Sequence, residues 1–154
     1  MVKYDDSAFR KMRGGWVDLA NLTLMIGVIG PGASELEEGS SLTLAELALI
    51  HEYGTDTIPE RSFMRSTLLA RRGDLAALQV TVFKRVLARE LTARAALELV
   101  GEQCVSWIRA AIVAGIDPPL ATETILRKGS TKPLIDHGQL CRAIDGQRLH
   151  RLIG

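Results

Sequence analysis

Apolar residues spaced three and four positions apart through the middle of the chain constrain its fold more than any other feature. Residues at this spacing lie on one face of an α-helix. Two runs follow the pattern, one on either side of Thr92: Leu75, Leu78, Val82 and Val86, then Leu97, Val100, Cys104, Trp107 and Ala111. They predict two amphipathic helices, the first reaching about Leu91, the second capped by Thr92 and ending at Gly115. Cys104 lies on the second apolar face, so it is expected to be a buried core residue.

Shorter helices are expected before these two. Thr43 can cap a short helix, because Glu46 follows three residues later as in a capping box, and Gly54 is a natural stop. The next helix is predicted at about residues 61–72. Gly73-Asp74 then offers a break and a new helix start.

Two strands are expected near the ends of the chain. Apolar residues occupy every second position between Leu22 and Val28, which predicts a strand at about residues 20–30. Asp145-Gly146 is a turn signal, and alternation at residues 147–153 predicts a second strand, suited to pair antiparallel with the first. Residues 1–15 are expected to form a polar arm or a short helix ending at Gly14-Gly15.

Together these patterns predict an α+β fold. It is a helix-rich single domain over residues 1–154, with long helices at about residues 62–115 and a small antiparallel sheet. The length of 154 residues is about one domain's worth, and 47% hydrophobic residues allow a real core. No apolar stretch approaches the ~20 residues needed to span a bilayer. Residues 1–13 contain no apolar signal segment, so a cytoplasmic protein is expected.

Charge is unevenly distributed along the chain. Residues 1–60 contain four basic and ten acidic residues, whereas residues 61–94 contain eight basic and two acidic. Opposed poles favour head-to-tail contact between copies of one chain, although two solvated faces would give the same pattern. An exposed acidic loop is expected at residues 33–41, where three glutamates lie close together: Glu35, Glu37 and Glu38.

Few residues suggest catalysis or metal binding. Cys104 and Cys141 are far apart and belong to no Cys/His cluster, so structural zinc is not expected. His137 and Cys141 could share a helical face, but a Cys–His nucleophile pair usually needs a third orienting group. No phosphate-binding glycine motif occurs. We therefore expect no enzyme activity, no catalytic residue, no metal and no cofactor.

A DNA-binding or regulatory domain is the alternative. The basic residues of the 61–94 helices could contact phosphates, which requires only positive charge. Aromatic residues make up just 5% of the chain, so surfaces for base stacking are scarce. Arg85 and Arg89 are four positions apart and are predicted to share one helical face.

Two ordered sets of motifs are more specific than any of these features. The first is IHEYGT at residues 50–55 with IPERSFMR at 58–65. The second lies in residues 118–140 and comprises PPL, TI, RKGS and KPLIDHGQL, in that order. Together they resemble the bacteriophage virion-morphogenesis and tail-completion family, which includes head–tail joining, neck and minor tail proteins. The resemblance covers roughly residues 50–144.

The resemblance implies a structural virion protein at the head–tail junction of a long-tailed phage. It implies a neck, tail-completion or tail-terminator ring of this chain, with six copies. Its expected partners are the neighbouring connector and tail proteins, with non-specific contact to DNA in the channel and none to membrane. It would be made in the host cytoplasm and kept in the virion.

The first set of motifs suggests scaffold and contact residues. Gly54 permits the turn after the short helix, and Pro59 stops the helix from continuing and sets the chain direction. Phe63 is large enough to anchor the next helix in the core. Arg61 and Arg65 are predicted to be exposed on one side and able to pair with acids of a neighbour.

The second set suggests a contact loop at about residues 116–133. Loops of this length usually contact partners, although a plain structural loop is the alternative. A basic, flexible segment is expected at Arg127, Lys128 and Gly129, followed by Lys132 and the stiffening Pro133. Asp136 and Gly138 suit a turn or helix start before a short helix ending near Ala143. The complete set of candidate interface residues is Glu35, Glu37, Glu38, Arg61, Arg65, Arg85, Arg89, Arg127, Lys128 and Lys132.

Overall fold

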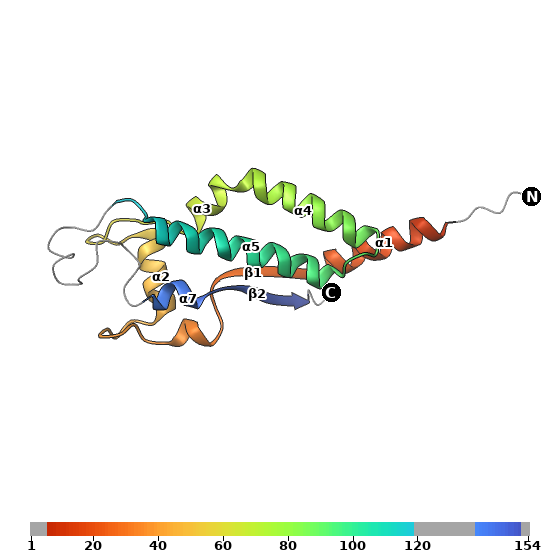
Figure 1. Cartoon of the computed structure of the whole chain (residues 1–154). Coiled ribbons are helices and arrows are strands. Elements are labelled where there is room, and N and C mark those ends of the chain that lie inside the picture. The colour runs from red at the N-terminus through yellow and green to blue at the C-terminus, as the bar shows by residue number, and fades with distance from the viewer. Residues whose placement is uncertain (1–5, 119–137, 152–154) are drawn as a thin grey trace, which may run out of the picture.

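A long central helix organises the molecule, which is known from a computed structural model. The structure describes residues 6–118 and 138–151, with residues 147–151 described through their backbone alone. The central helix is α5, Ala93–Ala114. One side of α5 packs on helix α4, Arg72–Leu87, and the other on strands β1, Leu22–Val28, and β2, Ile144–Arg151 (Figure 1). The predicted α+β class, helix-rich with a small antiparallel sheet, is confirmed.

The shorter elements lie at the two ends of α5. Helix α1, Ser7–Ala20, packs near the start of α5 and extends away from the molecule, while α2, Leu44–Tyr53, and α7, Gln139–Ala143, lie at the opposite end (Figure 1). A 3₁₀ turn, η1 at Pro31–Ser34, precedes α2, and helix α3, Arg65–Ala70, precedes α4.

The helix starts and stops in the middle of the chain are mostly confirmed. Thr43 and Glu46 form the predicted capping box of α2, Thr92 caps α5, and Gly54 and Gly115 follow the two helices. The predicted break at Gly73-Asp74 is wrong. The chain breaks at Arg71, and Asp74 lies in the first turn of α4, where it forms an ion pair with Arg71 at 3.1 Å.

The first helix is longer than the sequence predicts. Gly14-Gly15 was expected to end it, yet α1 continues through both glycines to Ala20. Gly15 is buried, and a Cβ there would lie 3.1 Å from the backbone oxygen of Val86. The glycines let α1 approach the end of α4 closely. This packing offsets the low helix propensity of glycine.

The two strands pair antiparallel, as predicted, from Leu22 opposite Arg151 to Val28 opposite Ile144, with an irregularity between Met25 and Gly27. The predicted turn at Asp145-Gly146 is wrong, because β2 already begins at Ile144.

Close packing of β2 on α5 explains why Gly146 belongs to a strand. A Cβ on Gly146 would lie 2.9 Å from both the backbone oxygen of Gly101 and Cγ2 of Val105. A Cβ on Gly101 would likewise collide with the backbone oxygen of Gly146. Two glycines distant in sequence therefore allow the strand backbone to touch the helix backbone.

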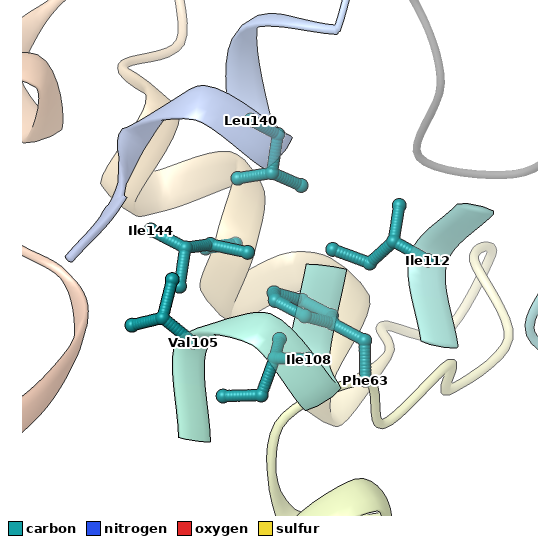
Figure 2. Close-up of a cluster of buried hydrophobic side chains, with 7 residues drawn as sticks. Phe63, Val105, Ile108, Ile112, Leu140 and Ile144 are labelled. Carbon is teal, nitrogen blue, oxygen red and sulfur yellow. The ribbon is translucent and has the colours of Figure 1, made fainter. Parts of the chain in front are cut away.

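Two clusters of buried side chains line α5. At its start, Cys104 is fully buried beside Val82, Val86 and Val100, which confirms its predicted core position. At its end, Phe63 is fully buried in the other cluster, as predicted. This second cluster joins α2, α5, α7 and β2, and it contains Ala48, Phe63, Val105, Ile108, Ile112, Leu140 and Ile144 (Figure 2).

Candidate functional site

The first motif folds around a buried carboxylate. Glu52 lies in the last turn of α2 and is only 2% exposed. Its Oε2 accepts hydrogen bonds from the backbone N–H groups of Phe63 and Met64 at 2.9 and 3.0 Å. Its Oε1 accepts from the Ser62 hydroxyl at 2.8 Å and from the backbone N–H of Arg65 at 2.9 Å. One side chain thus holds the approach to α3.

These contacts favour the ionised form of Glu52. Burial by itself would raise the pKa of the carboxyl. The hydrogen bonds donated by the Met64 and Arg65 backbones and by the Ser62 and Arg65 side chains outweigh it, so the pKa lies below its ordinary value. The carboxylate therefore stabilises the loop as a charged acceptor at neutral pH.

Arg65 is held by its own chain. Its Nε donates to Oε1 of Glu52 at 3.0 Å, and its Nη2 donates to the backbone oxygen of Glu52 and to Oε1 of Glu60, both at 2.8 Å. The guanidinium lies 4.4 Å from the centre of the Tyr53 ring. The side chain is exposed, as predicted, and already has these partners within its own chain, so its pairing with acids of a neighbour stays a prediction.

Arg61 is buried, at 4% exposure, so the prediction that it is exposed is wrong. Its Nε donates to the backbone oxygen of Pro118 at 2.7 Å, and its backbone N–H donates to the oxygen of His51 at 2.7 Å. Burial lowers the pKa of the guanidinium. The residue ties the first motif to the start of the second, because Pro118 opens that stretch.

Gly54 is required where α2 ends. Its φ is +71°, and a Cβ would lie 2.8 Å from the backbone nitrogen of Glu60 and 2.9 Å from the oxygen of Ile58. The chain then folds back, with the Thr55 N–H donating to the oxygen of Ile58 at 2.7 Å. Pro59 is exposed in this loop. Gly54 and the Thr55–Ile58 hydrogen bond together form a tight turn at the end of α2.

The described part of the second motif joins the same end of the molecule. Gly138 adopts a left-handed conformation at the start of α7, as its predicted role requires, and Leu140 is buried against Phe63 and its neighbours. Arg109 of α5 donates to the backbone oxygens of Cys141, Arg142 and Ile144. The remaining candidates lie outside the described residues: Arg127, Lys128, Gly129, Lys132, Pro133, Asp136 and His137.

The predicted acidic loop packs beside the second motif. The backbone N–H of Glu38 donates to Oε1 of Gln139 in α7 at 3.1 Å. Glu35 and Glu38 are exposed, while Glu37 is half-buried. Residues 33–60 contain seven Asp and Glu residues and neither Lys nor Arg. This segment is therefore acidic, and Arg61, Arg65 and Arg142 lie at the same end of the molecule.

Several of the basic candidates at the opposite end form intramolecular ion pairs. Arg89 is bound to Asp18 of α1 at 2.7 Å, and Arg85 lies 3.8 Å from Glu90. The prediction that Arg85 and Arg89 share a helical face is wrong, because α4 ends at Leu87 and Arg89 has a φ of 64°. Among the described residues, Lys84 forms no ion pair.

Four residues shape the fold in ways that the sequence did not predict. They are Glu52, Arg109, Gly101 and Gly146. Glu52 belongs to the IHEYGT stretch, but no role of its own was predicted for it. A usable signal was its place in IHEYGT, followed within ten residues by an arginine-rich, helix-starting segment.

No group of three or more His, Cys, Asp or Glu residues within the described ranges could hold a metal ion. Cys141 is half-buried in α7, while burial raises the pKa of the Cys104 thiol.

In the part of the chain that is described, no helix combines the length and hydropathy needed to cross a bilayer. The candidate site is the end of α2, where the buried carboxylate of Glu52 holds the following loop.

Comparison of the chain with protein-family models, with curated proteins and with solved structures gives no significant match.

Proposed function

We propose that this chain is a structural virion protein at the head–tail junction of a long-tailed bacteriophage. Copies would form a neck, tail-completion or tail-terminator ring that joins the tail to the head and passes DNA. The observation that carries the proposal is the ordered pair of motifs at residues 50–65 and 118–140, which resemble that phage family. Such a subunit acts by fitting against neighbouring chains and breaks no covalent bond.

The contacts within the first motif support this proposal. Glu52, Gly54, Arg61 and Arg65 each have a specific partner within the motif or at the start of the second, so these identities serve one folded unit. The polar side chains of this unit form hydrogen bonds and ion pairs within it. A rigid, preorganised end of this kind suits a subunit that must dock in one orientation.

Charge polarity along α5 supports a head-to-tail ring. The acidic loop and α2 lie at one end, and the basic end of α4 lies near the other (Figure 1). When complementary surfaces lie at opposite ends of one molecule, repeated contact closes into a ring if the rotation between copies permits. We expect Glu35 and Glu38 of one copy to approach the Lys84 and Arg85 region of the next.

A charge-swap experiment tests this contact in assembling particles. Replacing Lys84 and Arg85 with glutamate should lower the yield of joined particles by about tenfold, because like charges then meet across the interface. Adding Glu35→Lys and Glu38→Lys in the same chain should restore much of that yield. The swap avoids Arg89, whose 2.7 Å ion pair with Asp18 joins the end of α4 to α1, whereas Arg85 lies 3.8 Å from the exposed Glu90. If the variant with glutamate at positions 84 and 85 gives as many joined particles as the wild type, this contact is excluded.

The virion role itself is tested in a phage that encodes this chain. Deleting the gene should leave filled heads and finished tails that do not join, and supplying the chain in trans should restore infectious particles. Mass spectrometry of purified virions should detect the protein at the junction. Normal particles from the deletion, or absence of the chain from virions, would refute the proposal.

The DNA-binding alternative is weakened by the ion pairs of the 61–94 region. Arg71, Arg85, Arg89 and Arg94 each have an acidic partner in the same chain, and Arg61 is buried. Intramolecular pairing reduces the positive charge available for phosphates. A salt-dependent gel shift of the purified chain at physiological salt would instead favour this alternative.

A further inference from the structure

Arg89 occupies a backbone position that ordinarily belongs to glycine. Its φ is 64°, and among the residues that the structure describes it is the only non-glycine with a positive φ. Its N–H donates to the oxygen of Val86 at 3.0 Å. The N–H of Glu90 donates to the oxygen of Arg85 at 2.9 Å. These two bonds form a Schellman motif at the end of α4, in which the left-handed residue is usually glycine because a Cβ there is strained.

Helix α1 contains the opposite exception at Gly14, which lies inside a helix where glycine is unfavourable. A Cβ on Gly14 would collide with Nη2 of Arg89, and the two next-nearest atoms also belong to that side chain. The glycine therefore makes room for the arginine head group. Nη1 of Arg89 donates to Oδ2 of Asp18, one turn later on α1, at 2.7 Å. We call Arg89 with Gly14 and Asp18 the Arg89 contact.

One contact explains both exceptions. The reverse arrangement, with glycine ending α4 and a larger residue inside α1, would satisfy both local preferences, yet it would leave Asp18 without this partner. Departures from local preference concentrate where a residue has a role beyond its own element. The role of Arg89 is therefore to hold α1 against the end of α4.

Little else holds α1. Residues 7–13 are exposed, and only Gly14, Gly15 and Leu19 of this helix are at least partly buried. The first half extends beyond the rest of the described chain (Figure 1). A helix of 14 residues is marginal in water by itself, so α1 should lose its helical structure when it leaves α4. Segments with few buried apolar contacts open locally at low free energy.

We propose that α1 is a detachable arm and that the Arg89 contact sets how often it leaves its place on α4. The arm opens while α4, α5 and the sheet stay folded. Arg89 and Asp18 are 44% and 51% exposed, so dissolved ions reach their ion pair and weaken it. Rising ionic strength therefore shifts the arm towards the released state. This conformational step goes beyond the phage role and is measured on the purified chain.

Hydrogen–deuterium exchange of the purified full-length chain measures this opening. Amides of residues 14–20 should exchange faster than those of α5, because they exchange through local opening. Arg89→Gly and Asp18→Asn should each speed exchange in α1 by about three- to fivefold, the size expected for an exposed ion pair, and leave α5 unchanged. Added salt should speed exchange of α1 in the wild type and have almost no effect in Asp18→Asn.

Global stability separates this role from that of an ordinary structural contact, whose loss would lower global stability and α1 protection together. Arg89→Gly removes the contact and also relieves the left-handed backbone, so urea denaturation should show a variant at least as stable as the wild type. Arg89→Ala removes the contact and keeps the strain, so its unfolding constant should be about fivefold larger than that of Arg89→Gly. The matched control is Arg94→Ala, which removes an exposed ion pair with Glu98 on α5 and should leave exchange of α1 unchanged.

Gly14→Ala tests the coupling between the two exceptions. In the wild type the added Cβ displaces the arginine head group, so α1 should exchange as fast as before or faster. In the Arg89→Gly background the same change only adds helix propensity, so exchange of α1 should slow by about fivefold. Equal effects in the two backgrounds would overturn the proposal. So would wild-type α1 amides that exchange as slowly as those of α5, or unchanged α1 exchange in Arg89→Gly.

Discussion

Replacing Glu52 with alanine is expected to lower the free energy of unfolding by about 3–5 kcal/mol, because several buried or partly buried donors lose their acceptor at about 1–3 kcal/mol each. The change leaves the backbone N–H groups of Phe63, Met64 and Arg65 without their acceptor. Buried donors that lose a partner are individually costly. Thermal denaturation should show a melting temperature lower by on the order of 10 °C.

Glu60→Ala is the matched control for this measurement. Glu60 also accepts a hydrogen bond from Arg65, at 2.8 Å, but its side chain is exposed. Exposed ion pairs contribute only about 0–1 kcal/mol, so this variant should melt close to the wild type. If the two variants lose similar stability, the carboxylate of Glu52 does not hold the loop as described.

The contribution of Glu52 should depend on pH with a defined sign. Its folded-state pKa is lowered, so the stabilisation is fully present above the unfolded value of about 4.3 and is lost as pH falls through the folded value. The stability difference between the wild type and Glu52→Gln, measured by urea denaturation, should therefore narrow below about pH 4. A difference that stays constant down to pH 2 would contradict the assigned ionisation.

Replacing Gly101 with alanine is expected to destabilise the protein by about 1–3 kcal/mol, the typical cost of overpacking. This expected loss of stability is the reverse of what helix propensity alone predicts, because propensity favours alanine over glycine by about 1 kcal/mol inside a helix. The reason is that a Cβ on Gly101 collides with the backbone of Gly146 in β2. Urea denaturation of the variant gives the value directly.

Replacing Gly73 with alanine, on the neighbouring helix α4, is expected to raise the free energy of unfolding rather than lower it. Gly73 lies inside α4, and a Cβ there meets no atom within 4 Å. Alanine at this position should therefore stabilise the protein by up to about 1 kcal/mol. Equal effects at the two glycines would mean that β2 does not lie directly on α5 at Gly101.

The structure at the end of α2 was only partly predictable from the sequence. Gly54, Phe63 and Gly138 have their predicted structural roles. Arg61 and Arg65 were assigned to a partner, whereas the fold assigns them to Pro118 and Glu52. A charged side chain does not reveal in sequence whether its partner lies in the same chain.

The sequence alone predicts the helical faces of α4 and α5, the caps at Thr43 and Thr92, and the positions of the two strands. These features depend on residues a few positions apart, or on alternation within one strand, so local physics decides them. Tertiary contacts, by contrast, place Gly146 in a strand and Glu52 at the centre of a loop. Both depend on contacts between distant residues, where close packing and buried hydrogen bonds outweigh local preference.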